Sequence, residues 1–392
     1  MDHSAGAPNL FGSGYVGSGD LDMHSNPEFP SMSRREFIAT STAGLAMNNR
    51  VGGKSPGGGA ANAATRVIID TDPGVDDALA LLLAMRSPEV SIEAITPVAG
   101  NVPLDLTLPN ALRIVEAAGR TSIPVAAGAT GPLVRHLVTA TYAHGRNGLA
   151  GSIFPTPTTP PSRLNAAQMI REVVRRYPHE VTIVGIGPLT NVATALRADP
   201  GLASLILRIV IMGGSLSGGN ITPAAEFNIY VDPEAAQIVF QAGIPLTMVG
   251  LDVTRKVILT EKHVERLEAG HDAISRAAAQ IARKTLEHAH RESPPVDPAM
   301  HDPLAVAEVI RPGLLELQDY HVEIELAGEL TAGETVGYAH APVRRAAQTA
   351  GAAGSSPDIS DRFVPNVKVA VGVNPEEFFK LFIGRLAGES RP

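Results

Sequence analysis

The chain has 392 residues, 44% of them hydrophobic, and a formal net charge of −8 at pH 7. That length can bury a large core in one or two domains, while the negative charge argues against nucleic acid or an anionic membrane surface as a partner. The absence of cysteine excludes disulfides, thiolate metal sites and a cysteine nucleophile, and no apolar run approaches the roughly 20 residues of a transmembrane span.

Residues 1–64 are predicted to form a tail outside the fold, because they are rich in Gly, Ser, Asn and Pro and show no periodicity. Arg34-Arg35 precedes a phenylalanine and a weakly apolar run, and Ala61-Asn62-Ala63 offers a cleavage site. This pattern is similar to a twin-arginine export signal and predicts a periplasmic or otherwise exported protein. The alternative is a cytoplasmic protein whose disordered tail carries an accidental arginine pair.

Strand and helix patterns alternate from Arg66 onward. This alternation predicts an α/β domain over residues 65–392 with a doubly wound, mostly parallel sheet flanked by helices. The helix at residues 76–86 is apolar all round, so we expect it to be buried. The predicted strands are Val67–Asp70, Ser91–Val98, Ile123–Ala126, Val181–Ile186, Leu205–Met212 and Pro245–Gly250, and the predicted helices are Asp76–Arg86, Leu106–Ala118, Ala166–Tyr177, Thr190–Ala198 and Pro233–Ala242.

The regular alternation of strand and helix patterns ends in the last third of the chain. Residues 261–291 form a long helical stretch with a break predicted near Gly270, and a final helix is predicted from Pro375. Residues 341–361, rich in Ala, Gly and Ser, are predicted to form a mobile surface loop. Between these segments we expect a small set of strands at Tyr320–Ala327, Glu334–His340 and Asn366–Val373.

The first predicted strand ends in an acidic loop, Asp70-Thr71-Asp72-Pro73-Gly74-Val75-Asp76-Asp77. Two carboxylates held about 4 Å apart repel by about 4 kcal/mol at an effective dielectric near 20, so a fold that gathers four of them needs a proton or a cation. Carboxylate oxygens suit Ca²⁺ or Mg²⁺. Ligands also bind at the carboxyl ends of parallel strands, which favours a site over a helix cap and a filled turn.

Polar residues follow other predicted strands as well. Each has a structural alternative: Asn101 suits a turn, Asp302 suits a helix N-cap before a proline, and Glu226 suits a solvated position. These residues belong to short motifs that follow the acidic loop in order along the chain. The motifs are Ala99-Gly100-Asn101, Val210-Ile211-Met212-Gly213-Gly214, Ala225-Glu226-Phe227-Asn228, Val231-Asp232-Pro233, Met248-Val249-Gly250-Leu251-Asp252 and His301-Asp302-Pro303.

This ordered set resembles the inosine-uridine nucleoside hydrolases over about residues 66–388. The resemblance implies a doubly wound α/β fold, one bound Ca²⁺, and hydrolysis of the N-glycosidic bond of ribonucleosides to a free base and ribose. It also implies a homo-oligomer, either a dimer or a tetramer, with a small-molecule nucleoside as its substrate. The metal ligands would be Asp72, Asp77, Asp302 and the backbone carbonyl of Ile186, where the family usually has threonine.

The resemblance assigns further roles by position. Asp72 would also accept the proton of the attacking water, Asp70 would support the metal loop, and His301 would protonate the leaving base near its ordinary pKa of about 6.5. The alternative for His301 is a packed residue at a helix start. The predicted substrate-binding residues are Asp76, Asn101, His144, Met212, Asn220, Glu226, Phe227 and Asn228.

One segment departs from the family pattern. Where the family usually places aromatic residues over the base, this chain has Glu287-His288-Ala289-His290-Arg291-Glu292. Either histidine could stack on or protonate the base, and the simpler expectation for each is a solvated helix face. Tryptophan is absent, which disfavours stacking of a purine on an indole, and His301 and His144 favour inosine and uridine.

Two other functions fit part of the pattern. A haloacid dehalogenase-type phosphatase also places Asp-x-Asp after a first strand, but it has no role for Asp76-Asp77 or for the later asparagines, and it normally has Thr or Val where this chain has Gly74. A Ca²⁺-dependent nucleoside- or sugar-binding protein would keep the same site without turnover. Release of ribose or of phosphate would separate these alternatives from a hydrolase.

Overall fold

The computed structural model describes residues 63–291, 298–339 and 363–388. Residues 1–62, which hold the predicted export signal, and the predicted loop at 341–361 lie outside the described residues. The chain from residue 61 onward forms one compact unit. None of the helices in the described part combines the length and the apolarity needed to cross a membrane.

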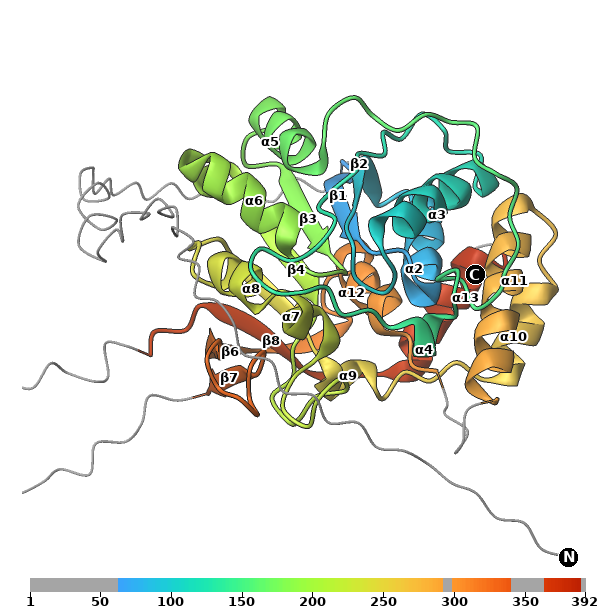
Figure 1. The fold of residues 1–392 in the computed structure, drawn as a ribbon. Helices are drawn as coiled ribbons and strands as arrows, with labels where there is room; N and C mark the ends of the chain where they lie inside the picture. Colours follow the sequence, from blue (N-terminus) through green and yellow to red (C-terminus); the bar gives the residue numbers. More distant parts are fainter. Residues whose placement is uncertain (1–62, 292–297, 340–362, 389–392) are drawn as a thin grey trace, which may run out of the picture. The chain divides into compact units, whose positions relative to one another are not determined.

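An eight-stranded sheet runs through this unit in the order β2-β1-β3-β4-β5-β8-β6-β7 (Figure 1). Neighbouring strands pair in parallel from β2 to β8, whereas β6 pairs antiparallel with both β8 and β7. The predicted doubly wound, mostly parallel sheet with extra C-terminal strands is therefore confirmed. The strands are β1 Thr65–Thr71, β2 Val90–Pro97, β3 Val181–Gly185, β4 Arg208–Met212, β5 Leu246–Val249, β6 Leu315–Ile324, β7 Thr335–Tyr338 and β8 Val367–Val373.

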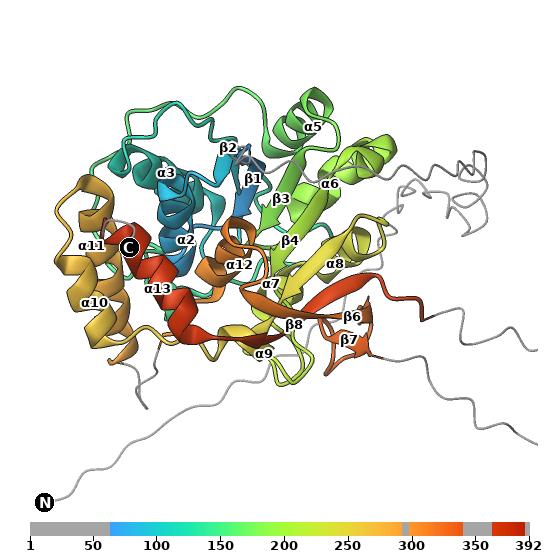
Figure 2. The same ribbon diagram turned by 180° about the vertical axis from the view of Figure 1, so that it is seen from behind.

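Helices cover both faces of the sheet (Figures 1 and 2). One apolar cluster holds α2, α3, α11, α12 and α13 against the sheet, and a second cluster holds α5, α6 and α8 on the opposite face. The helices are α2 Val75–Arg86, α3 Leu104–Ala117, α4 Thr141–His144, α5 Ala166–Arg176, α6 Thr190–Ala198, α7 Phe227–Val231, α8 Pro233–Phe240, α9 Leu251–Thr254, α10 Glu261–Glu268, α11 Ala273–Ala289, α12 His301–Ile310 and α13 Pro375–Leu386, with a 3₁₀ helix at Pro200–Leu205.

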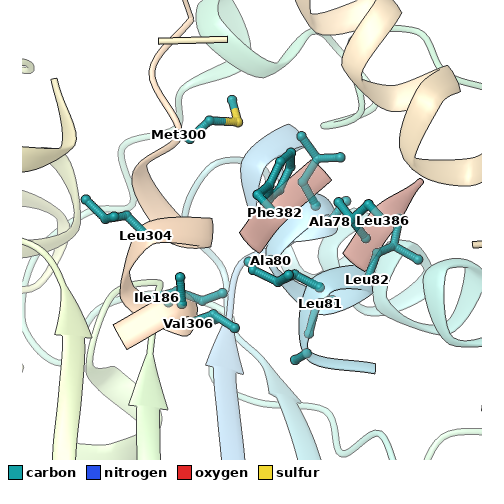
Figure 3. Close-up of a cluster of buried hydrophobic side chains, with 14 of the residues drawn as sticks. Ala78, Ala80, Leu81, Leu82, Ile186, Met300, Leu304, Val306, Phe382 and Leu386 are labelled. Atoms are coloured by element: carbon teal, nitrogen blue, oxygen red, sulfur yellow. The ribbon is translucent and has the colours of Figure 1, made fainter. Parts of the chain in front are cut away.

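Helix α2 is buried on every side, as its sequence predicts. Each residue from Val75 to Met85 is buried, because α2 lies between the sheet and the helices α11, α12 and α13. Figure 3 shows Leu81 and Leu82 of α2 within the same apolar cluster as Leu304 of α12 and Phe382 of α13. This packing fixes the first turn of α2, which carries Asp76 and Asp77, relative to the sheet.

One predicted strand is wrong. Residues 123–126 make only an isolated bridge between Val125 and Ile95 of β2. Pro124 has no N–H to donate to a ladder, which limits pairing at this edge of the sheet. The break predicted near Gly270 is confirmed, since α10 ends at Glu268 and α11 begins at Ala273.

The carboxyl ends of the parallel strands meet at one edge of the sheet. Strand β1 leads into Asp72, β2 leads toward Asn101, β3 leads into Ile186 and β4 ends at Met212. Because all these strands run in one direction, residues far apart in the sequence come together at this edge, where open α/β sheets bind ligands.

Candidate active site

Asp72 is fully buried just beyond β1. Its Oδ2 accepts a hydrogen bond from the backbone N–H of Asn101 at 2.7 Å. Two glycines make room for this carboxylate, because a Cβ on Gly100 would lie 2.1 Å from Oδ2 and a Cβ on Gly187 would lie 2.6 Å from Oδ1. No side chain larger than hydrogen fits at either position without moving the carboxylate.

Asp77 organises the acidic loop from within the first turn of α2. Its Oδ1 accepts hydrogen bonds from the Thr71 hydroxyl at 2.6 Å and from the Asp72 backbone N–H at 3.1 Å. Its Oδ2 accepts from the Gly74 backbone N–H and from Asn101 Nδ2, both at 3.0 Å. The loop is thus closed around this carboxylate.

Asp302 brings a further buried carboxylate from the first turn of α12. Asp76, Asp77 and Asp302 each offer one carboxylate oxygen, and these oxygens lie within 4.8 Å of one another. Burial raises the pKa of Asp302 well above its ordinary value, and the charges of Asp76, Asp77 and Asp72 raise it further. Burial is also the largest cause that raises the pKa of Asp72 well above its ordinary value, and repulsion from Asp77 is the next largest. The cluster therefore favours a proton or a cation among these oxygens.

The donor set suits a hard cation. Within the described residues, Asp70 Oδ2, Asp72 Oδ1 and Asp76 Oδ1 are buried carboxylate oxygens without a hydrogen-bond partner. Leaving such an atom unsatisfied costs about 1–3 kcal/mol, or more when it is charged. The Ile186 carbonyl, the fourth predicted ligand, accepts a hydrogen bond from Asn228 Nδ2 at 3.2 Å and has a second lone pair. Oxygen ligands of this kind favour Ca²⁺ or Mg²⁺.

Asp70, the residue predicted to support the metal loop, is fully buried in β1. Burial raises its pKa to about 7, against hydrogen bonds from Thr96 and Asn191 that lower it. Thr96 Oγ1 donates at 2.6 Å and Asn191 Nδ2 at 2.8 Å, both to Asp70 Oδ1. Asn191 was not among the predicted site residues, although it follows the end of β3 by a few residues, much as those residues follow other strands.

A cavity of about 500 Å³ opens above the acid cluster. All eight predicted substrate-binding residues line it, together with Ile186, His301 and Asp302, whereas Asp72 and Asp77 are fully buried and do not line it. The structure thus brings together residues from seven separate segments of the chain. The lining residues that sequence reasoning did not identify include Val75, Tyr142, Arg255, Ile258, Thr285 and Met300.

One wall of the cavity is built by a buried acid at the start of α7. Glu226 is the N-cap of this helix and accepts from the backbone N–H groups of Asn228 at 3.0 Å, Ile229 at 3.2 Å and Gly214 at 3.0 Å. It is 2% exposed, so the solvated alternative is wrong. Burial raises its pKa to about 7, although these hydrogen bonds lower it.

The asparagines beside Glu226 are held by backbone groups. Asn220 Oδ1 accepts from the Phe227 N–H at 2.9 Å. Asn228 Nδ2 donates to the carbonyls of Ile186 and Met212. Each side chain is therefore fixed before any ligand arrives, which lowers the entropic cost of binding one.

Two histidines lie on the other side of the cavity. His301 Nδ1 is 2.8 Å from Thr254 Oγ1, and burial lowers the pKa of His301, partly offset by the charge of Asp76. His144 Nδ1 accepts from the Val75 backbone N–H at 3.2 Å, and burial lowers the pKa of His144 to about 4. His144 is therefore neutral at pH 7, with its proton on Nε2, because Nδ1 acts as the acceptor.

The two histidines of the unusual segment differ in position. His288 lines the cavity, and its Nε2 lies 2.8 Å from the carbonyl oxygen of Tyr142 in α4. The solvated alternative therefore fails for His288. His290 is the exposed C-cap of α11 and does not line the cavity.

Comparison with known proteins identifies the architecture. The family model for the inosine-uridine preferring nucleoside hydrolases matches residues 67–380. The chain belongs to this family. It is accordingly a ribonucleoside hydrolase, an enzyme that cleaves N-ribosyl bonds, and the phosphatase alternative is excluded.

Curated and solved relatives agree with this assignment. The chain is 45% identical to the pyrimidine-specific ribonucleoside hydrolase RihA of Escherichia coli O1:K1 over 271 residues, which are 69% of this chain and 87% of the relative. A plant nucleoside hydrolase matches with a TM-score of 0.74 and 33% identity, over 82% of this chain and 99% of that one. A purine-preferring ribonucleoside hydrolase from Gardnerella vaginalis matches with a TM-score of 0.73 and 31% identity, over 82% and 98%. Relatives of this nucleoside hydrolase thus carry different base preferences in their names.

Proposed function

We propose that this nucleoside hydrolase cleaves ribonucleosides of the inosine and uridine type in a Ca²⁺-dependent reaction. One observation carries the proposal: the cavity lined by all eight predicted substrate-binding side chains is also lined by Asp302, and Asp76 and Asp302 belong to a cluster of buried carboxylates in which Asp76 Oδ1 has no hydrogen-bond partner among the described residues. The relative with the name pyrimidine-specific supports uridine as the first substrate to test.

In this proposal, the ion would be held by Asp72, Asp77, Asp302 and the Ile186 carbonyl. Asp76 offers a further carboxylate oxygen beside them. When bound, Ca²⁺ would supply positive charge that binds ribose hydroxyl oxygens and makes a neighbouring water more acidic. The buried carboxylates then keep their negative charge at neutral pH, because a cation offsets the repulsion that raises their pKa values.

The side chains around the sugar determine how the bond breaks. Cleavage at an anomeric carbon passes through an oxocarbenium-like state, so negative and polar oxygens close to the ribose stabilise the charge that develops. The ribose hydroxyls would be bound by Asp76, Asn101, Asn220, Glu226 and Asn228. Asp72 Oδ1, which has no hydrogen-bond partner, would accept the proton of the attacking water.

The leaving base needs a hydrogen-bond donor. Burial lowers the pKa of His301, so this imidazole is not the ordinary acid of pKa about 6.5 that the sequence suggests. A neutral imidazole still donates one N–H, and we propose that His301 donates it in a hydrogen bond that stabilises the negative charge building up on the leaving base. His144, with its proton on Nε2, would donate to an acceptor atom of the base.

The experiment that tests the proposed function is ribose release from a panel of ribonucleosides, measured with and without a calcium chelator. Uridine, cytidine, inosine and adenosine cover both base classes. The proposal expects hydrolysis of uridine or inosine that stops with chelator and returns with added Ca²⁺. Turnover that a chelator leaves unchanged would contradict the Ca²⁺ dependence, and tight nucleoside binding without ribose release would contradict the proposed hydrolysis of these substrates.

We also propose that the amino-terminal segment directs export by the twin-arginine route. The support is the sequence pattern around Arg34-Arg35, with Ala61-Asn62-Ala63 before the first strand. Cell fractionation of the full chain tests this, with Arg34→Lys combined with Arg35→Lys as the matched variant. Export that survives the double substitution would contradict the proposal.

Assembly into a dimer or tetramer is a further proposal, supported by the family resemblance alone. Light scattering coupled to size-exclusion chromatography measures the mass directly. A mass of a single chain at micromolar concentration would contradict it.

A further inference from the structure

Helix α9, Leu251–Thr254, is followed directly by Arg255, which lines the cavity. The helix begins one residue after Gly250, beyond the carboxyl end of β5, and Thr254 is fully buried. Neither Thr254 nor Arg255 has a role in the chemistry described above. Their contacts, however, reach toward His301 in one direction and toward Asn220 in the other.

The contacts toward His301 come from both backbone and side chain. The segment after α9 pairs with the segment before His301, because the Met300 N–H donates to the Val257 carbonyl at 2.8 Å and the Leu259 N–H donates to the Pro298 carbonyl at 2.9 Å. The Thr254 hydroxyl lies 2.8 Å from His301 Nδ1. The backbone pairs place the start of α12, and the hydroxyl fixes the imidazole ring.

The hydroxyl contact has a chemical consequence. A neutral imidazole carries one proton, on either Nδ1 or Nε2, and its hydrogen-bond partner decides which. A hydroxyl can donate as well as accept, so the Thr254 hydroxyl can donate a hydrogen bond to His301 Nδ1, which then acts as the acceptor. The proton then resides on Nε2, which can donate a hydrogen bond to a ligand in the cavity.

The contacts in the other direction hold the loop at residues 214–220. Leu251 N–H donates to the Gly214 carbonyl at 3.0 Å, and Asp252 accepts from the Leu216 N–H at 2.9 Å and from the Ser217 hydroxyl at 2.6 Å.

Arg255 completes this set of contacts. Its guanidinium donates to the carbonyl of Gly218 at 3.4 Å and to the carbonyl of Gly219. These glycines directly precede Asn220, so the guanidinium fixes the backbone from which that side chain extends.

We propose that Thr254 and Arg255 are positioning residues that act on different parts of the reaction. Thr254 orients the His301 ring as a hydrogen-bond donor to the leaving base, and Arg255 holds the loop that brings Asn220 to the ribose. This inference rests on the proposed function, because it takes His301 as the donor to the base and Asn220 as a ribose ligand.

Substitutions of Thr254 and of Arg255 should affect the nucleoside and p-nitrophenyl riboside differently. Thr254→Val keeps the side-chain shape and removes the hydroxyl. It should lower kcat on uridine or inosine by about tenfold or more, as expected when the leaving base loses a well-oriented hydrogen-bond donor, and leave p-nitrophenyl riboside within about twofold, since that leaving group is a stable anion. Thr254→Ser keeps the hydroxyl and should restore most of the lost kcat.

Arg255→Gln should instead affect both substrates alike. Loss of the contacts to the loop weakens ribose binding whatever the leaving group is, so kcat/KM should fall by a similar factor, about three- to tenfold, on the nucleoside and on p-nitrophenyl riboside. Thermal midpoints of all variants show whether the fold persists.

The outcomes separate this inference from the proposed function. If wild-type protein releases ribose and His301→Ala is selective for nucleosides, but Thr254→Val slows both substrates equally or Thr254→Ser fails to restore kcat, the positioning role of Thr254 is wrong. If Arg255→Gln affects only one substrate, its assignment to the ribose side is wrong. If wild-type protein releases no ribose from any nucleoside, the proposed function itself fails.

Discussion

Oδ2 of the Asp72 carboxylate accepts a hydrogen bond from the backbone N–H of Asn101, at 2.7 Å. The other oxygen, Oδ1, is buried and has no hydrogen-bond partner among the described residues. The first contact orients the carboxylate, so the second oxygen points in a defined direction although no group in the described part of the chain donates a hydrogen bond to it. A buried acceptor of this kind is costly unless a ligand completes it.

Asp72→Asn should abolish most turnover while the fold persists. The amide cannot accept a proton from water, and removal of a general base typically costs 10²–10⁴-fold, so we expect kcat to fall by at least about 100-fold. Ribose release and the thermal midpoint measure the two effects. Asp105→Asn, at an exposed position on α3, is the control. Activity of the Asp72 variant close to that of the control would remove Asp72 from the role of base.

His301→Ala should discriminate between leaving groups. Nucleosides whose base needs a proton should slow by about 100-fold or more, whereas p-nitrophenyl riboside should slow only slightly, because its leaving group is a stable anion. The ratio of kcat/KM values on the two substrates is the measurement. Equal losses would show that His301 contributes packing or binding instead of proton donation.

Removal of the metal should lower stability as well as activity. A ligand present at 100 times its Kd stabilises the folded state by about 2.7 kcal/mol, and an ion at the acid cluster also offsets the repulsion among Asp76, Asp77 and Asp302. We expect the thermal midpoint to fall by several degrees after chelation and to recover with Ca²⁺.

Asp77→Asn provides the matched comparison for this experiment. The variant should have lost the dependence of its midpoint on Ca²⁺. An identical shift in wild-type and variant protein would place the ion elsewhere.

Stability against acid should depend on Asp272. Burial alone would raise the pKa of Asp272, but hydrogen bonds from Arg86 and Ser275 outweigh it and lower the pKa from 3.8 to about 2. The Arg86 Nη2 atom lies 2.6 Å from Asp272 Oδ2. Since the folded-state pKa is depressed, the ionised carboxylate stabilises the fold above its unfolded pKa, and this stabilisation disappears as the pH falls through the folded pKa.

Asp272→Asn keeps a side-chain oxygen for the helix cap and removes the charge. The variant should have a lower thermal midpoint than wild type at neutral pH, and the difference should shrink as the pH falls from about 4 to about 2. Midpoints measured across that range provide the check. A difference that stays constant with pH would assign the effect to the cap and not to the ion pair.

The sequence alone determined the layers of the fold and the residue types of the site. Alternating strands and helices predict a parallel sheet, because each pattern reflects local burial and a local period. The order of Asp72, Asn101 and Glu226, each after a different predicted strand, predicts one shared edge, since parallel strands that run in one direction end on the same side. The strand predicted around Val125 failed because pairing depends on a neighbour that local pattern does not record, and Pro124 removes a donor there.

Only the tertiary structure decided how the residues work together. No sequence pattern around Thr254 indicates a role in the site, because a threonine in a short helix is common. Its role depends on contact with His301, which is 47 positions further along the chain. The same holds for the pKa of His301, which the sequence places near its ordinary value and burial lowers. Protonation, tautomer and orientation depend on desolvation and on distances between segments remote in sequence, and these exist only once the chain has folded.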